Sequence, residues 1–179
     1  MIPTARSLRA AAFALPLIAA APAMAEVTAA APDGFTLHFE GTVPLSADEA
    51  WARLLDIGAW WSPDHTYSGD AGNLSLDAAP GGCWCEIWDG GAVEHGRVLL
   101  LRAPVQARFD APFGPLQGLG VTAILTATLG DPEDAADSGA TPVSFDFVVS
   151  GSSLSTLEPL APIVDQVMGE QFSRFVAPS

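Results

Sequence analysis

Residues 81–103 read "GGCWCEIWDGGAVEHGRVLLLRA", and this stretch carries the strongest secondary-structure signal of the chain. An Asp-Gly-Gly turn at 89–91 separates two runs of β-branched, aromatic and aliphatic residues, which is typical of a β-hairpin. We therefore predict strands over 83–88 and 92–103. Both cysteines, two of the five tryptophans and one of the three histidines lie in the first fifteen residues of the stretch, so the hairpin is also a candidate for chemistry.

The rest of the chain indicates a fold of the α+β class. Alternation of apolar and polar residues predicts a strand over 35–43. Ser46 and Glu49 form a capping box at the start of a short helix that ends near 56–58. Strands are also predicted at 74–78, 121–129 and 142–151, a strand leading into a turn at 105–115, and a long amphipathic helix at 157–176. A run of strands with helices kept to one face favours an antiparallel sheet.

The N-terminus has the pattern of a secretory signal peptide. Arg6 and Arg9 precede an uncharged apolar run over 10–23, and Ala-Met-Ala at 23–25 supplies small residues at a cleavage site. The run is shorter than the ~20 residues of a membrane span. We therefore predict a periplasmic or secreted protein with no membrane span after cleavage. Its parts are a signal peptide at 1–25, a linker at 26–34 and one domain at 35–176.

The chain is strongly acidic, with 21 Asp and Glu against 7 Arg and Lys and a formal net charge of −14. All seven basic residues are arginines, and signal cleavage would remove two of them and no acidic residue. Such a surface repels phosphate backbones and anionic lipid headgroups. Nucleic acid and anionic membrane surfaces are therefore not expected as partners.

The stretches "SADEAWARLLDIGAWW" at 46–61, "GGCWCE" at 81–86 and "VEHGRVLLLRAP" at 93–104, followed by a long terminal helix, resemble the START-like, or SRPBCC, superfamily. This superfamily includes polyketide cyclase-like proteins and homologues of an activator of the heat-shock protein ATPase. The resemblance implies a helix-grip fold, in which a curved antiparallel β-sheet wraps around the long C-terminal helix and leaves a cavity. Members bind lipids, sterols, hormones or polyketides and some catalyse cyclisation, so fold alone does not give the function.

Cys83 and Cys85 lie two residues apart on a predicted strand. Their Cα atoms are then about 6.5–7 Å apart, at the far edge of disulfide geometry. We expect two packed thiols, with a disulfide as the alternative. A zinc site would need this pair together with His95 and His65, whereas tetrahedral zinc sites commonly combine two close ligand pairs. We therefore predict no metal and no cofactor.

The hairpin register decides which side chains meet. A two- or four-residue loop around the glycines at 90–91 places Glu86 opposite His95, whereas a three-residue loop with a glycine bulge places it opposite Glu94. The family pattern favours the second register. A buried Glu86–Glu94 pair would share a proton and a Glu86–His95 pair would hold opposite charges together, and either pair can also be purely structural.

The connection at 59–73 is long, polar and rich in aromatic residues, and in a helix-grip fold it lies near the cavity mouth. Its tryptophans and tyrosine combine apolar area with one polar group, which suits the binding of a mostly apolar molecule. One of Trp60 and Trp61 is expected to fill the core instead. Phe113 and Leu116 are expected on the opposite rim. The predicted cavity and rim residues are Trp61, His65, Tyr67, Trp84, Glu86, Glu94, His95 and Gln117.

Three functions follow as hypotheses. The first is an exported protein that binds a small apolar or amphipathic molecule between sheet and helix. The second is a cyclase- or dehydratase-like enzyme that uses Glu86, with His95 or Glu94, as general acid and base. The third is a structural or interaction protein without a ligand. The sequence gives no prediction of the oligomeric state.

Overall fold

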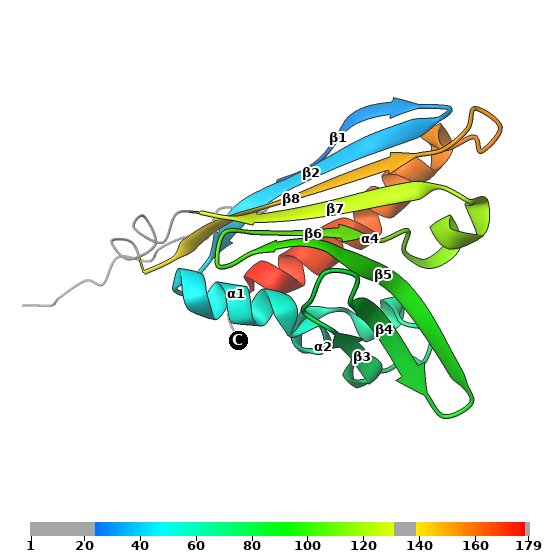
Figure 1. Cartoon of the computed structure of the whole chain (residues 1–179). Coiled ribbons are helices and arrows are strands. Elements are labelled where there is room, and N and C mark those ends of the chain that lie inside the picture. The colour runs from blue at the N-terminus through cyan, green and yellow to red at the C-terminus, as the bar shows by residue number, and fades with distance from the viewer. Residues whose placement is uncertain (1–23, 131–138, 178–179) are drawn as a thin grey trace, which may run out of the picture.

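A computed structural model describes residues 24–130 and 139–177, which form a curved antiparallel sheet around a C-terminal helix (Figure 1). The strands are β1 (Met24–Ala31), β2 (Gly34–Val43), β3 (Leu74–Leu76), β4 (Cys83–Trp88), β5 (Gly91–Arg102), β6 (Gln106–Asp110), β7 (Thr122–Leu129) and β8 (Thr141–Ser150). The helices are α1 (Ala47–Leu55), α2 (Ile57–Trp60) and α4 (Ala161–Val176). Single 3-10 turns are η1 (Pro63–His65), η2 (Ala71–Asn73) and η4 (Glu158–Leu160), and η3 (Gly114–Leu119) is longer.

The strand order places the first and the last strand of the described chain in the same half of the sheet. The order is β1-β2-β8-β7-β6-β5-β4-β3. After β2 the chain leaves the sheet through α1 and α2 and rejoins it at the opposite edge as β3. From there each strand pairs with the next until β8 meets β2. The connection from α1 to β3 therefore crosses the side of the sheet that faces α4.

The core lies between the concave face of the sheet and α4. Alternate residues of the central strands point inward and are buried, as the period of two in the sequence predicts. From α4, the Phe172 ring packs at centroid distances of 5.9 Å from Phe39 and 5.1 Å from Phe145. Phe175 packs 5.4 Å from Trp60. These contacts hold the C-terminal half of α4 against the sheet, and the helix-grip fold implied by the sequence is confirmed.

The capping box predicted for the first helix is present. The Ser46 hydroxyl accepts from the Glu49 N–H, and the Glu49 carboxylate accepts from the Ser46 N–H at 3.0 Å. The helix ends at Leu55, and the short helix α2 follows, with its last two residues inside the connection predicted at 59–73. Arg53 donates from Nε to the carbonyl of Phe175 at 2.9 Å, so α1 also caps the C-terminal end of α4.

The prediction of a linker at 26–34 is wrong. Residues 24–31 form β1, which pairs with β2 from Met24 opposite Glu40 to Ala31 opposite Gly34. Alanine has low β-propensity, so local preference favours a loop here, but the free edge of β2 supplies a ladder of backbone hydrogen bonds. The predicted signal peptide falls outside the described residues except at Met24 and Ala25, and most of the acidic loop at 130–140 lies outside them too.

Candidate functional site

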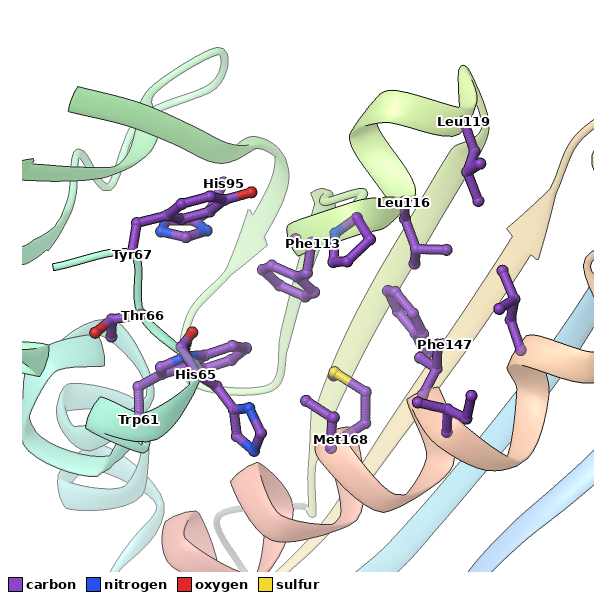
Figure 2. Close-up of a pocket in the computed structure, with 16 residues that line it drawn as sticks. Trp61, His65, Thr66, Tyr67, His95, Phe113, Leu116, Leu119, Phe147 and Met168 are labelled. Atoms are coloured by element: carbon purple, nitrogen blue, oxygen red, sulfur yellow. Dashed lines mark hydrogen bonds between the residues drawn. The ribbon is translucent and has the colours of Figure 1, made fainter. Parts of the chain in front are cut away.

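A pocket of about 400 Å³ lies between the 61–67 loop, strand β5, η3, β8 and the N-terminal half of α4 (Figure 2). Its volume falls within the range of small-molecule binding sites, about 300–1,000 Å³. Its lining includes exposed side chains, among them Tyr67 with 56% and Ile163 with 61% of the surface accessible. The pocket is therefore open to solvent at one side.

The two ends of the pocket differ in polarity (Figure 2). The end formed by the 61–67 loop and β5 carries Trp61, His65, Thr66, Tyr67 and His95. The end formed by η3, β8 and α4 carries only apolar side chains, including Phe113, Leu116, Leu119, Phe147, Val164 and Met168. A molecule that fills this pocket would place an apolar body at one end and its polar group at the other.

Glu86 lies behind the polar end of the pocket and joins the 61–67 loop to His95. Its side chain is 0% exposed, and its carboxylate accepts hydrogen bonds from three groups. The N–H of Tyr67 donates to Oε2 at 3.0 Å, the N–H of Ser68 to Oε1 at 2.5 Å, and Nε2 of His95 to Oε2 at 2.8 Å. One carboxylate on β4 thus fixes both the loop and the imidazole that line the pocket.

The electrostatics of Glu86 keep it ionised. Desolvation by burial raises the pKa of its carboxyl, but hydrogen bonds from Ser68, Tyr67 and His95 outweigh burial and leave the pKa below its ordinary value of 4.5. A negative charge without exposure to water therefore lies directly behind His95. His95 itself is 3% exposed.

The 61–67 loop is also tied to α4. The N–H of Ser62 donates to Oε1 of the buried Gln171 at 2.7 Å, and His65 donates from Nε2 to Glu170 at 3.1 Å. Hydrogen bonds from Ser62 and His65, against an opposing desolvation, lower the pKa of the Glu170 carboxyl. The indole N–H of Trp61 donates to the His65 carbonyl at 3.1 Å. The loop is therefore held from both the sheet and the helix.

The hairpin register is neither of the two that we predicted. The loop has two residues, 89–90, and Glu86 lies opposite Val93. Trp84 lies opposite Gly96, so the register shifts by one and His95 is the extra residue of a β-bulge. His95 and Gly96 are consecutive and both buried. The Glu86–His95 contact exists, but it is a diagonal contact beside a bulge.

The alternative Glu86–Glu94 pair is wrong, because Glu94 points away from the pocket. Its side chain is 41% exposed and accepts a hydrogen bond from Arg97 at 2.6 Å. Gln117 donates to the backbone carbonyl of Glu94 and is itself exposed. Neither Glu94 nor Gln117 belongs to the pocket lining.

Of the other predicted residues, Trp61, His65, Tyr67 and His95 line the pocket. Trp84 does not: it lies buried in the wall behind, with its ring 5.2 Å from Trp61. Glu86 is likewise behind the lining. As expected, one tryptophan of the adjacent pair fills the core, since Trp60 is buried and only Trp61 reaches the pocket.

Several lining residues were not among the predicted site residues. Leu160 at the end of η4 and four α4 positions belong to an apolar stripe at helical spacing, which is equally typical of core packing. The α4 positions are Ile163, Val164, Val167 and Met168. The exposure of Ile163 shows that this stripe is wider than the core needs, but exposure is not visible in a sequence. No sequence signal marks Thr66, which lines the pocket next to Tyr67, whose N–H donates to Glu86.

The expectation of free thiols is also wrong, because Cys83 and Cys85 form a disulfide. Their Cα atoms are 5.3 Å apart, which is within the usual range for a disulfide and shorter than a regular strand predicts. The two cysteines flank Trp84, next to the point where the β4–β5 pairing shifts register, so this part of the sheet is not a regular ladder. Among the described residues, no group of three or more His, Cys, Asp or Glu side chains is arranged to hold a metal ion.

Across residues 24–130 and 139–177, no helix combines the length and the apolar character needed to cross a bilayer.

No protein-family model and no curated protein sequence matches this chain. The chain is similar in structure to a Thermobifida fusca protein solved by solution NMR, with a TM-score of 0.54 at 17% identity over 79% of this chain and 90% of that chain. It is also similar to a Nitrosomonas europaea protein, with a TM-score of 0.53 at 10% identity over 78% and 90% of the two chains. The crystal structure of Ara h 8.0201 matches with a TM-score of 0.50 at 11% identity over 79% and 95%. At such identities the likeness concerns the fold alone, and the fold is a helix-grip.

Proposed function

We propose that this protein is an exported member of the START-like superfamily that binds a small, largely apolar molecule in the pocket between sheet and α4. The observation that carries the proposal is the pocket itself, about 400 Å³ in volume, open at one side and apolar over most of its lining. An apolar pocket of this volume that keeps a few polar groups at one end is the usual form of a small-molecule site.

Native mass spectrometry of the protein purified from its own host tests the proposal. We expect a retained organic molecule on the wild-type chain. Met168→Trp places a larger side chain into the pocket and should abolish the retained mass. Val148→Trp, on the outer face of β8 and partly exposed, is the matched control and should keep it. Wild-type protein without a bound molecule that also binds none of the apolar probes described below would overturn the proposal.

The same preparation tests export. If the signal peptide is removed after Ala25, the mature chain begins at Glu26 and occurs outside the cytoplasm. Mass measurement of the intact chain gives the cleavage point. A full-length chain that begins at Met1 would contradict this part of the proposal.

An acid–base enzyme is a second candidate, and the buried Glu86–His95 pair at the pocket wall favours it. General acid–base catalysis needs a titratable group within about 3 Å of the proton that it moves. A dehydratase would carry two retained species that differ by the mass of one water, and His95→Gln would accumulate the heavier one. A single retained species that is the same in wild type and variant favours binding without reaction.

A further inference from the structure

The polar end of the pocket contains the buried imidazole of His95, and one of its two ring nitrogens already makes a hydrogen bond within the protein. Nε2 of His95 donates to Glu86 at 2.8 Å. Within residues 24–130 and 139–177, Nδ1 has no hydrogen-bond partner, and it is not among the fully enclosed polar atoms left without one. Since His95 lines the pocket and is otherwise buried, Nδ1 is the atom of this ring that a pocket occupant can reach.

The hydrogen-bond partner of Nε2 determines whether Nδ1 of the neutral ring is a donor or an acceptor. A carboxylate is only an acceptor, so it requires the proton of the neutral imidazole to lie on Nε2. Nδ1 then carries a lone pair and accepts hydrogen bonds. The three donors around Glu86 keep that carboxylate an acceptor, so the neutral ring is held in this tautomer.

The surroundings of His95 favour a neutral donor over a charged group. The Tyr67 ring lies 5.8 Å from the imidazole ring and borders the opening, and the remaining pocket wall is mainly apolar. The buried negative charge of Glu86 lies directly behind the ring, so an anionic ligand group at Nδ1 would be repelled. A hydroxyl group brings a donor without a charge.

Building on the proposed function, we propose that Nδ1 of His95 is the hydrogen-bond acceptor for the pocket occupant. The ligand class is then an apolar molecule that carries a hydroxyl donor, a phenol or an alcohol, at one end. The hydroxyl lies at His95, and the apolar body lies along η3 and α4. Glu86 acts as a positioning residue, because it sets the orientation and the tautomer of the ring.

Four probes that share a biphenyl body and differ in the group at position 4 test this assignment by calorimetry or ligand-observed NMR: biphenyl, 4-phenylphenol, 4-methoxybiphenyl and biphenyl-4-carboxylate. We expect 4-phenylphenol to bind about 3- to 10-fold more tightly than biphenyl, which is the usual net effect of one neutral hydrogen bond. The methoxy compound keeps the oxygen but lacks the donor, so it should bind no more tightly than biphenyl. The carboxylate should bind most weakly.

Two variants test which histidine causes the preference for 4-phenylphenol over biphenyl. His95→Phe keeps an aromatic ring and removes Nδ1, so it should bind 4-phenylphenol and biphenyl with equal affinity. His65→Phe changes the other imidazole of the pocket and should alter both affinities together, keeping their ratio. Loss of the preference in His65→Phe, or its survival in His95→Phe, would overturn the assignment.

NMR of histidine-labelled wild-type protein gives a readout that needs no variant. We expect His95 to be protonated at Nε2 and not at Nδ1, and its Nδ1 signal to shift with 4-phenylphenol but not with biphenyl. Equal binding of all probes, or tightest binding of the ether or the carboxylate, refutes the hydroxyl assignment and leaves the proposed function standing. Absence of binding by every probe, together with no retained molecule, refutes both.

Discussion

Replacing Glu86 by glutamine keeps the size of the side chain and removes the buried charge on which the pocket wall depends. The wild-type carboxylate accepts from Tyr67, Ser68 and His95 through its two oxygens. Glutamine has one acceptor oxygen, and its amide nitrogen is itself a donor. At least one of the three donors therefore loses its acceptor in Glu86→Gln.

The size of the effect follows from these contacts. A hydrogen bond to a charged group contributes about 1.5–3 kcal/mol, and a buried donor without a partner costs about 1–3 kcal/mol. We therefore expect Glu86→Gln to lower the free energy of unfolding by about 2–4 kcal/mol at neutral pH. Glu94→Gln, which removes an exposed carboxylate paired with Arg97, should cost less than about 1 kcal/mol.

Urea unfolding followed by tryptophan fluorescence measures both variants. The sign of the pH dependence is also determined. Because the folded-state pKa of Glu86 is lowered, its contribution is present above the ordinary pKa of 4.5 and is lost as the pH falls through the folded-state value. The difference between wild type and Glu86→Gln should therefore shrink in acid. A difference below about 0.5 kcal/mol at neutral pH would refute the anchoring role.

Three further predictions concern other parts of the fold. Phe172→Ala removes a fully buried ring from α4 and should cost about 3–5 kcal/mol in urea unfolding; a loss below about 1 kcal/mol would contradict the packing described here. A hydrogen bond to Asp146 raises the pKa of His38 above 6.5, so its stabilising contribution is full below pH 6.5 and disappears as the pH rises through the folded-state value. The melting temperature of His38→Asn should accordingly fall below that of wild type at about pH 5.5 and match it at about pH 9, whereas an equal gap at both pH values would exclude this pair as the cause. Arg53→Met removes the donor to the Phe175 carbonyl at the end of α4 and should cost about 1–2 kcal/mol by thermal unfolding, with an unchanged melting temperature as the contrary outcome.

In the β4–β5 hairpin, the sequence predicts the two strands but not the register in which they pair. The Asp-Gly-Gly turn and the flanking apolar runs correctly predict two paired strands, because turn chemistry is local. The choice between Glu94 and His95 as the partner of Glu86 depends on a bulge, which shifts the register between Cys85 and Trp84. A strict period of two cannot represent a strand in which consecutive residues both face inward.

In the N-terminal strand β1, the sequence fails to predict the strand itself. Its alanine-rich sequence lacks β-propensity, and only the unpaired edge of β2 makes it a strand. The site residues also divide into those that local sequence predicts and those that depend on contacts between distant segments. The 61–67 loop could be predicted from its aromatic composition, whereas the position of Thr66 and the role of Glu86 as an anchor arise from contacts between segments far apart in the chain.

The pairing of β2 with β8 bears on how the protein folds. Residues that meet across this pair, such as His38 and Asp146, are 108 positions apart in the chain. Closing so long a loop has an entropic cost that is offset only when the last strand arrives, and such topologies fold slowly. The β1–β2 hairpin therefore lacks its main neighbour until nearly the whole chain has been synthesised. A polypeptide that completes its sheet late is slow to reach its folded state, and the export proposed above would require such an unfolded chain.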